Sequence, residues 1–290
     1  MPGESRAVDF HIHIQPWNEL LPAVRAKWVA GRGDAEWLEK VMAEPDELVR
    51  YLDRCGVERA VLINYPSPDL MGFTDATNDF VAKYRDAHPD RFTACGGVHP
   101  RLVKSPAEAR AQMDRICGKL RVSLVKLHPP HQMFELDDYK RGNGALAAIY
   151  EKAAEHGVPI MVHSGTSIFP GARSRLGDPM PMDDVCLDFP KTTFVLAHLG
   201  RPLWADAAFF LLRRHANLWA DCSGIPPKGL LEYFPRLAEI GDKVCFGTDW
   251  PSPGVKDLGA NLEAFRALPL AADVKAKILR GNALRLLGSR

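Results

Sequence analysis

The sequence predicts an α/β protein, a single-domain (β/α)8 TIM barrel over residues 1–290 with two insertions at the mouth of the barrel. Three observations support this fold class. Eight short apolar segments recur along the chain, amphipathic segments separate them, and the repeat of about 34 residues matches one strand–helix unit. A doubly wound open sheet would give a related pattern, but eight units in one chain favour the barrel.

The eight apolar segments have the composition of parallel strands. They are rich in Val, Ile, Leu and Phe and alternate little with polar residues, as strands do when helices cover them. The expected strands are Ala7–His13, Arg59–Asn64, Phe92–Val98, Ser123–Leu127, Pro159–His163, Thr193–His198, Leu218–Asp221 and Lys243–Gly247.

Several of the intervening segments carry a helical pattern, with apolar residues three and four positions apart. A helix is expected near Pro45–Cys55, and clear periodicity marks Asp75–His88, Pro106–Gly118, Gly144–Gly157 and Leu203–His215. Gly118 and Gly157 lie where helix C-caps are expected.

Two segments interrupt the repeat. Residues 15–44 contain Trp17, Trp28 and Trp37, and residues 164–181 are rich in Gly, Pro and Arg. Each follows the C-terminal end of an expected strand. In a barrel these ends surround the catalytic face, so we expect both insertions to cover it.

Composition excludes several classes of partner. The chain has 37 Lys and Arg against 36 Asp and Glu, a formal net charge of +1, so no basic surface is indicated for nucleic acid or for anionic membranes. Its six cysteines form no CxxC pair, and no apolar run reaches the roughly 18–20 residues of a membrane helix. These features favour a cytoplasmic protein that acts on a small molecule.

Histidines at strand ends indicate a metal site. His11 and His13 are two apart on the first strand, so their side chains share one face at the mouth of the barrel. His163, His198 and Asp249 follow apolar runs in the same way at the ends of strands five, six and eight. A single buried histidine is usually a core residue. Four strands that end in metal-competent side chains predict a site for a first-row metal, most often zinc.

The motifs in this order resemble those of the amidohydrolase superfamily (amidohydrolase-2 type), in particular the branch that contains aminocarboxymuconate-semialdehyde decarboxylase and related metal-dependent hydrolases. The resemblance covers nearly the whole chain and rests on these motifs: His11-x-His13, Lys126-Leu-His128-Pro129, His163-Ser-Gly, Ala197-His198-Leu-Gly200, Asp221-x-Ser-Gly224, Phe246-Gly-Thr-Asp249-Trp-Pro and the C-terminal segment Gly281-Asn-Ala-Leu-Arg-Leu-Leu287.

The resemblance implies one Zn2+ or another divalent metal per chain, with His11, His13, His163 and Asp249 as ligands and a water in the open position. His198 would be the catalytic base, and Asp249 would also take part in proton delivery. Some superfamily members instead carry a carbamylated lysine that bridges two metals, and Lys126 occupies that position. The resemblance also implies a homo-oligomer.

Other residues are candidates for substrate contacts. His128 and His99 end strands and could reach the pocket, and Arg173 (with Arg175) could hold a substrate carboxylate. Trp17 and Trp250 could form an aromatic wall. Each has a plainer alternative: a turn histidine, a solvated loop arginine, or a tryptophan that only excludes water. Asp221 is expected to accept a hydrogen bond near the metal or to act as a structural cap, rather than to bind the metal.

Two reactions fit this site. A hydrolase would use metal-activated water on a small amide, ester or lactone, and this reaction is favoured because it requires the fewest groups. The alternative is a zinc-dependent nonoxidative decarboxylase of an aromatic or enoic acid, which also needs a carboxylate-binding cation and a stacking wall. A barrel that binds a ligand without catalysis would be expected to lack one of the five side chains, and all are present.

Overall fold

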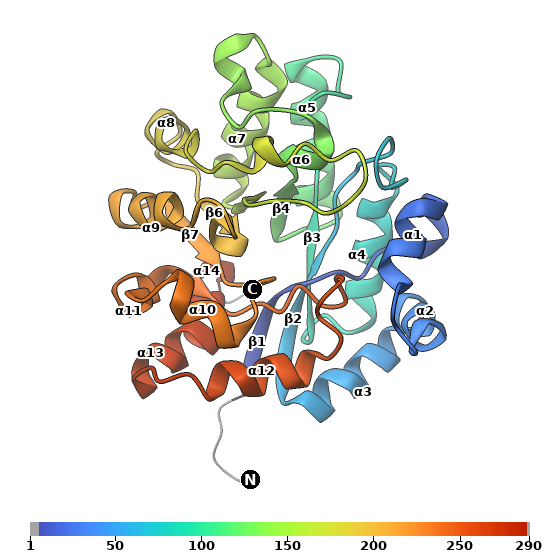
Figure 1. Ribbon diagram of the computed structural model, residues 1–290. Coiled ribbons are helices and arrows are strands. Elements are labelled where there is room, and N and C mark those ends of the chain that lie inside the picture. Colours follow the sequence, from blue (N-terminus) through green and yellow to red (C-terminus); the bar gives the residue numbers. More distant parts are fainter. Residues whose placement is uncertain (1–5, 289–290) are drawn as a thin grey trace.

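The computed structural model describes residues 6–288 and confirms the barrel (Figure 1). Eight strands lie in one sheet in chain order, and each pairs in parallel with the next. The strands are β1 (Ala7–Ile12), β2 (Val57–Ile63), β3 (Phe92–Gly96), β4 (Leu124–Leu127), β5 (Ile160–His163), β6 (Phe194–Ala197), β7 (Leu218–Asp221) and β8 (Val244–Cys245).

Backbone hydrogen bonds join the segment from β8 onwards to β1. The Phe10 N–H donates to the Phe246 carbonyl over 2.8 Å, and the Asp249 N–H donates to the His11 carbonyl over 2.8 Å. Ile12 also forms a parallel bridge with Trp250. These bonds bring the two edges of the sheet together, so the open doubly wound alternative is excluded.

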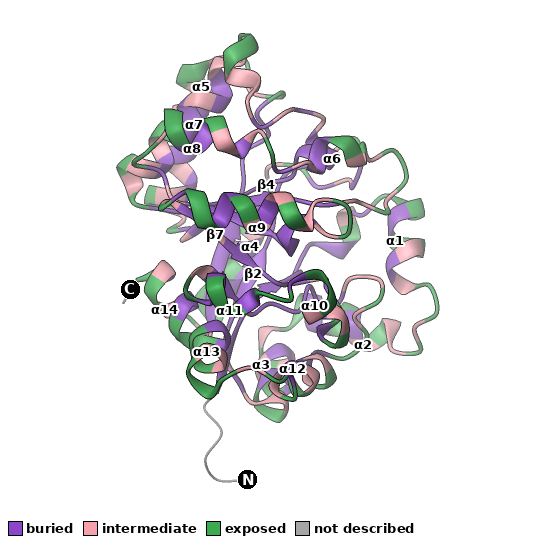
Figure 2. Cartoon of the chain, turned by 60° about the vertical axis from the view of Figure 1, so that its left-hand side comes forward, coloured by how far each residue is buried: buried purple, intermediate pink, exposed green. Residues whose placement is uncertain are grey.

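Helices surround the strands (Figure 1), and their exposed faces point outward while the strands are buried (Figure 2). The α-helices are α1 (Pro22–Val29), α2 (Ala35–Ala43), α3 (Pro45–Cys55), α4 (Thr77–Ala87), α5 (Pro106–Met113), α6 (Pro129–Gln132), α7 (Gly144–His156), α8 (Met182–Asp188), α9 (Ala205–Arg214), α10 (Pro227–Tyr233), α11 (Leu237–Ile240), α12 (Leu258–Arg266), α13 (Ala272–Ala276) and α14 (Asn282–Leu287). Short 3-10 or π turns are η1 (Trp17–Glu19), η2 (Asp114–Lys119), η3 (Asp138–Arg141), η4 (Ser174–Gly177), η5 (His198–Gly200), η6 (Gly241–Lys243) and η7 (Lys277–Gly281).

Of the two glycines expected to cap helix C-termini, one does so and the other does not. Gly157 ends α7 at φ 63°, the left-handed cap that its position predicts. The expectation for Gly118 is wrong. This residue lies inside the π turn η2, which continues α5 as far as Lys119. A π turn contains one extra residue, and it shifts the end of the helical segment past the glycine.

The inward-facing residues of the strands determine where the site lies in the barrel. Buried apolar residues fill its lower part, among them Leu124 on β4 and Met161 on β5. Lys126 and His163 stand two residues further along these strands, so their side chains continue the same inward column towards the mouth. A larger apolar cluster fills the space between strands and helices. Within residues 6–288, no helix has both the length and the apolar character needed to cross a membrane.

Candidate metal centre and pocket

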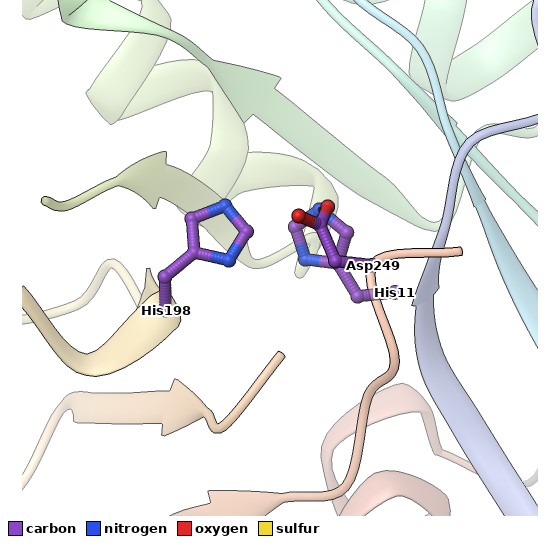
Figure 3. Close-up of side chains that lie close together, drawn as sticks. All are labelled: His11, His198 and Asp249. Carbon is purple, nitrogen blue, oxygen red and sulfur yellow. Dashed lines mark ion pairs between the residues drawn. The ribbon is translucent and has the colours of Figure 1, made fainter. Parts of the chain in front are cut away.

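Five side chains predicted for the site are brought together at the mouth of the barrel. His11 lies in β1, His13 follows it, His163 ends β5, His198 follows β6 and Asp249 follows β8, and all five are buried. One ligand atom each from His11, His198 and Asp249 lies within 4.8 Å of the others. Figure 3 shows His198 reaching in from one side, and His11 and Asp249 from the other.

His11 is held in a defined tautomer. Its Nδ1 donates to Asp221 Oδ2 over 2.8 Å, and both residues are fully buried. A ring that donates through Nδ1 keeps a lone pair on Nε2, and this atom has no hydrogen-bond partner in the described part of the chain. A carboxylate behind a ligating imidazole is the usual outer partner at metal sites. Asp221 is therefore a hydrogen-bond acceptor for His11, and its place beside a metal stays a prediction.

His198 is oriented by the same carboxylate. Its backbone N–H donates to Asp221 Oδ1, and the Ser223 hydroxyl also donates to this oxygen. Ser223 Oγ therefore accepts from His198 Nδ1 over 2.8 Å, and the Ser223 carbonyl lies 3.1 Å from the same nitrogen. Since Nδ1 carries the proton, His198 Nε2 has a free lone pair that can bind a metal or accept a proton.

Asp249 forms the anionic centre of the group. Its Oδ1 lies 3.0 Å from His13 Nε2 and 3.5 Å from His11 Nε2, and Arg201 lies 3.7 Å from Oδ2. Burial by itself would raise the pKa of Asp249, but the His13 hydrogen bond and the charges of His13, His11 and Arg201 hold its pKa at about 2. Asp249 is therefore a carboxylate at neutral pH.

The backbone is strained at two of these residues. Asp249 has φ 68° and His198 has φ 69°, in the left-handed region that residues other than glycine rarely adopt. Such conformations cost roughly 1–3 kcal/mol each and cluster at functional sites. The strain indicates that the fold positions these two side chains at a cost in stability.

His163 lies beside the compact group rather than within it. Its ring centroid is 4.8 Å from that of His198, and it stacks on His128 at 3.9 Å. Both of its ring nitrogens are buried without a hydrogen-bond partner in the described residues. Burial, followed by the charges of Lys126 and Arg201, holds the pKa of His163 well below its usual value, so the ring is neutral as a ligand must be.

A pocket opens above these residues. His128, which the sequence marked as a substrate contact, lines it together with His13, His163, His198 and Asp249. Its remaining lining is formed by Trp28, Tyr65, Met71, Lys126, His131, Thr166, Ser167, Ile168, Phe169, Arg201, Ser252 and Pro253.

The other candidate substrate contacts lie elsewhere. Trp17 and His99 each line a separate pocket, and Arg173 is exposed in the second insertion. Trp250 is fully buried, and its ring centroid lies 5.9 Å from that of Trp37, so it packs against the first insertion. The structure places none of these four on the lining of the pocket above the ligands.

Other residues supply the aromatic wall and the cation of the pocket. Trp28 and Phe169, with ring centroids 5.8 Å apart, form an aromatic wall from the two insertions, and Arg201 supplies a cation. Tyr65, His131 and Arg201 each follow a strand by a few residues, a signal that could have found them. Trp28 lies in an insertion with no repeat, and no comparable signal distinguishes it from Trp17.

Lys126 is fully buried on the same lining, and its Nζ has no hydrogen-bond partner within residues 6–288. Burial lowers the pKa of Lys126 to about 8. A substantial share of this amine is therefore neutral near physiological pH, and either form faces the pocket.

The donor set fits a divalent metal. Imidazole nitrogens and one carboxylate are ligands that zinc and neighbouring metals accept, and His11 Nε2 and both nitrogens of His163 are buried without partners. Unsatisfied buried polar atoms are costly, so these nitrogens fit a role as metal ligands better than a role in core packing. Which of the five side chains bind metal, and which one acts as the base, stays a prediction.

Comparison with known proteins identifies the family. The family model described as amidohydrolase matches residues 8–289. The chain belongs to the amidohydrolase family. The family resemblance of the motifs is thereby confirmed, and members of this family usually bind a divalent metal.

Individual relatives of this amidohydrolase differ in their reactions. A 2-pyrone-4,6-dicarboxylate hydrolase from Comamonas testosteroni is 31% identical over 124 residues, a match that covers 33% of this chain and only 41% of that protein. An uncharacterised TIM-barrel protein from Bordetella bronchiseptica is 25% identical with a TM-score of 0.77, over 97% of this chain and 98% of the other.

A dihydroxybenzoic acid decarboxylase from Polaromonas sp. JS666, solved with manganese and the inhibitor 2-nitroresorcinol, has a TM-score of 0.68 to this amidohydrolase. It is 17% identical, over 98% of this chain and 97% of the other. At that identity the likeness establishes the shared fold, and it leaves the reaction open.

Proposed function

We propose that this amidohydrolase is a metal-dependent hydrolase that opens a small carbonyl substrate, with a lactone as the best candidate among lactones, esters and amides. The observation that carries the proposal is the compact buried group of His11, His198 and Asp249, of which His198 and Asp249 line the pocket. The 31% identity to a 2-pyrone-4,6-dicarboxylate hydrolase over 124 residues supports the choice of a lactone, because a 2-pyrone ring is itself a lactone.

The residues divide the work as follows in this proposal. His11, His13, His163 and Asp249 would hold one Zn2+ or another divalent ion. Such an ion would polarise the carbonyl and lower the pKa of water towards about 7. His198 Nε2, left free by the Ser223 contacts at Nδ1, would accept a proton from the attacking water. That proton would then pass to the leaving oxygen, from His198 or by way of Asp249.

The test is a substrate panel assayed with metal-reconstituted protein. Lactones, esters and amides are compared with hydroxybenzoates, and acid release is measured separately from carbon dioxide release. We expect acid release from a lactone. Carbon dioxide release alone would contradict the proposal. Elemental analysis should find about one divalent metal per chain after reconstitution, and a clearly lower content would contradict the site.

His198→Asn tests the assignment of the base. We expect the variant to retain its metal and to lose at least about 100-fold in kcat, because a proton acceptor is removed while the four assigned ligands remain. Metal content by elemental analysis and kcat are measured on the same sample. Loss of the metal would instead make His198 a ligand, as its place in the compact group also allows.

Nonoxidative decarboxylation is the second candidate, because one observation favours it. The aromatic wall of Trp28 and Phe169 and the cations Lys126 and Arg201 line the pocket, and a carboxylated aromatic acid needs both kinds of group. The substrate panel separates the two reactions by their products.

A further inference from the structure

A second hydrogen-bonded unit lines the same pocket and includes none of the assigned ligands. It consists of Tyr65, which follows β2, His131 in α6, and Ser167 in the loop after β5. Tyr65 Oη lies 2.9 Å from His131 Nδ1, and His131 Nε2 lies 2.7 Å from Ser167 Oγ. Three segments that are distant in sequence thus meet in one series of hydrogen bonds.

The hydrogen bonds that link Tyr65, His131 and Ser167 have a defined donor-to-acceptor order. His131 is only 4% exposed, and burial, followed by the charges of Lys126 and His13, lowers its pKa well below its usual value. The ring is therefore neutral and has one donor and one acceptor nitrogen. The buried Tyr65 hydroxyl has no other acceptor in the described part of the protein, so it donates to Nδ1. His131 Nε2–H then donates to Ser167 Oγ.

The hydroxyl group of Ser167 accepts hydrogen bonds, and its own hydrogen remains available for donation. Its Oγ accepts from His131 and, over 3.4 Å, from the Phe169 N–H. Ser174 holds its backbone, since Ser174 Oγ accepts from the Ser167 N–H and donates to the Ser167 carbonyl, both over 3.2 Å. The Ser167 hydroxyl hydrogen has no acceptor within residues 6–288, and the residue is only partly buried on the pocket lining.

We propose that Ser167 is a substrate-binding residue whose hydroxyl donates a hydrogen bond to a carboxylate of the substrate, away from the carbonyl that is attacked. His131 and Tyr65 are positioning residues that direct this hydroxyl into the pocket. The unpartnered Lys126 Nζ and Arg201 Nε on the same lining favour a carboxylate over a neutral oxygen. The inference rests on the proposed function for the site of attack, because it assigns a contact to the same substrate.

Binding of two inert probes tests the contact without turnover. Benzoate offers one carboxylate and isophthalate offers a second one across a planar ring. Isothermal titration of metal-loaded wild type should show tighter binding of isophthalate by about 10-fold or more, the size of a hydrogen bond to a charged group. Ser167→Ala should abolish most of this preference, and Ser167→Thr, which keeps the hydroxyl, should restore it.

The positioning role of Tyr65 and His131 is tested by a separate variant. Tyr65→Phe removes the donor to His131 Nδ1, so the ring can reverse its tautomer and draw the Ser167 proton away from the substrate. We expect Tyr65→Phe to lower the isophthalate preference, and the double variant with Ser167→Ala to be no worse than Ser167→Ala alone. Tyr84→Phe is the matched control, since Tyr84 Oη donates to the Val41 carbonyl far from this unit and should leave the preference unchanged.

The tautomer itself can be observed. In 15N-histidine-labelled protein, with the His131 signals assigned by their loss in His131→Gln, Nε2 should carry the proton in wild type. A proton on Nδ1, or equal or undetectable binding of the two probes to wild type, would overturn the inference. A panel without hydrolysis but with an intact isophthalate preference would refute the proposed reaction and support the carboxylate contact.

Discussion

At the scale of single residues, Asp221 controls two imidazoles at once. Its Oδ2 accepts from His11 Nδ1, and its Oδ1 accepts from the His198 backbone and from Ser223, which in turn contacts the His198 ring. Burial raises the pKa of Asp221, but the charge and hydrogen bond of His11 outweigh it and keep the pKa below its usual value. One carboxylate therefore sets the tautomers of both rings.

Asp221→Asn should weaken metal binding by about 10–100-fold, the usual effect of losing an outer partner of a ligating histidine. The asparagine replaces one acceptor oxygen with a donor, so either His11 or the Ser223 and His198 pair loses its fixed orientation. Competition with a metal chelator measures the affinity. Asp206→Asn, an exposed substitution on α9 with the same change of charge, should leave the affinity unchanged.

The predicted ligands rest on a strong signal, because each stands at the end of an apolar strand and the ends of parallel strands converge at one face of a barrel. The substrate contacts had no such support. Arg201 follows β6 by four residues and lines the pocket, whereas Arg173 stands in an irregular loop and is exposed. Both residues are arginines, so residue type alone could not show which of them lines the pocket.

At the scale of elements, the loop after β5 is fixed by close backbone packing. Gly165 has φ 117°, and a Cβ there would lie 2.3 Å from the Arg201 carbonyl oxygen. Its N–H donates to the Gly177 carbonyl, and the Thr166 N–H donates to Arg201. The loop that carries Ser167 is thus clamped to its own far end and to the loop after β6.

Gly165→Ala should therefore lower the free energy of unfolding by at least about 2 kcal/mol, because it combines a left-handed backbone with a clash against main chain. Gly142→Ala is the matched control. Gly142 has φ 98°, but a Cβ there meets nothing within 4 Å, so only the backbone term of about 1 kcal/mol remains. Urea denaturation of both variants measures the difference, and equal losses would show that the clash is relieved.

The strands were predictable as elements because their apolar composition reflects burial on both faces, and each observed strand lies within its expected segment or within two residues of it. Helix ends were less predictable. The π turn η2 inserts one extra residue into the helical segment, and the apolar spacing of Pro106–Gly118 does not indicate it.

At the scale of the whole molecule, buried neutral histidines couple stability to pH. Burial lowers the pKa of His99 to about 4, and it lowers the pKa of His128 and His131 well below the usual value. These groups bind protons more tightly in the unfolded chain. Their contribution to stability is complete above about pH 6.5 and is lost as the pH falls towards the folded pKa.

Metal-free protein should therefore be less stable at pH 5 than at pH 7. Chemical denaturation at the two pH values measures this, in a range above most carboxylate titrations. For His99 alone the loss at pH 5 is about 2 kcal/mol, so His99→Gln should reduce the pH dependence by about that amount. His88→Gln is the matched control, because the His88 side chain is 31% exposed and not buried. An unchanged slope in His99→Gln would contradict the burial argument.

The sequence by itself determined the barrel, the eight strand ends and the side chains that meet there, because the period of the strand–helix unit and the convergence of parallel strands leave few alternatives. It also identified the family. The tertiary structure alone decided which side chains form the pocket: Trp28 rather than Trp17, and Arg201 rather than Arg173. It also placed His198 close to His11 and Asp249, two of the predicted metal ligands, and joined Tyr65, His131 and Ser167. The physical reason is that loop conformation depends on contacts between distant segments, and no periodic pattern in the chain encodes them.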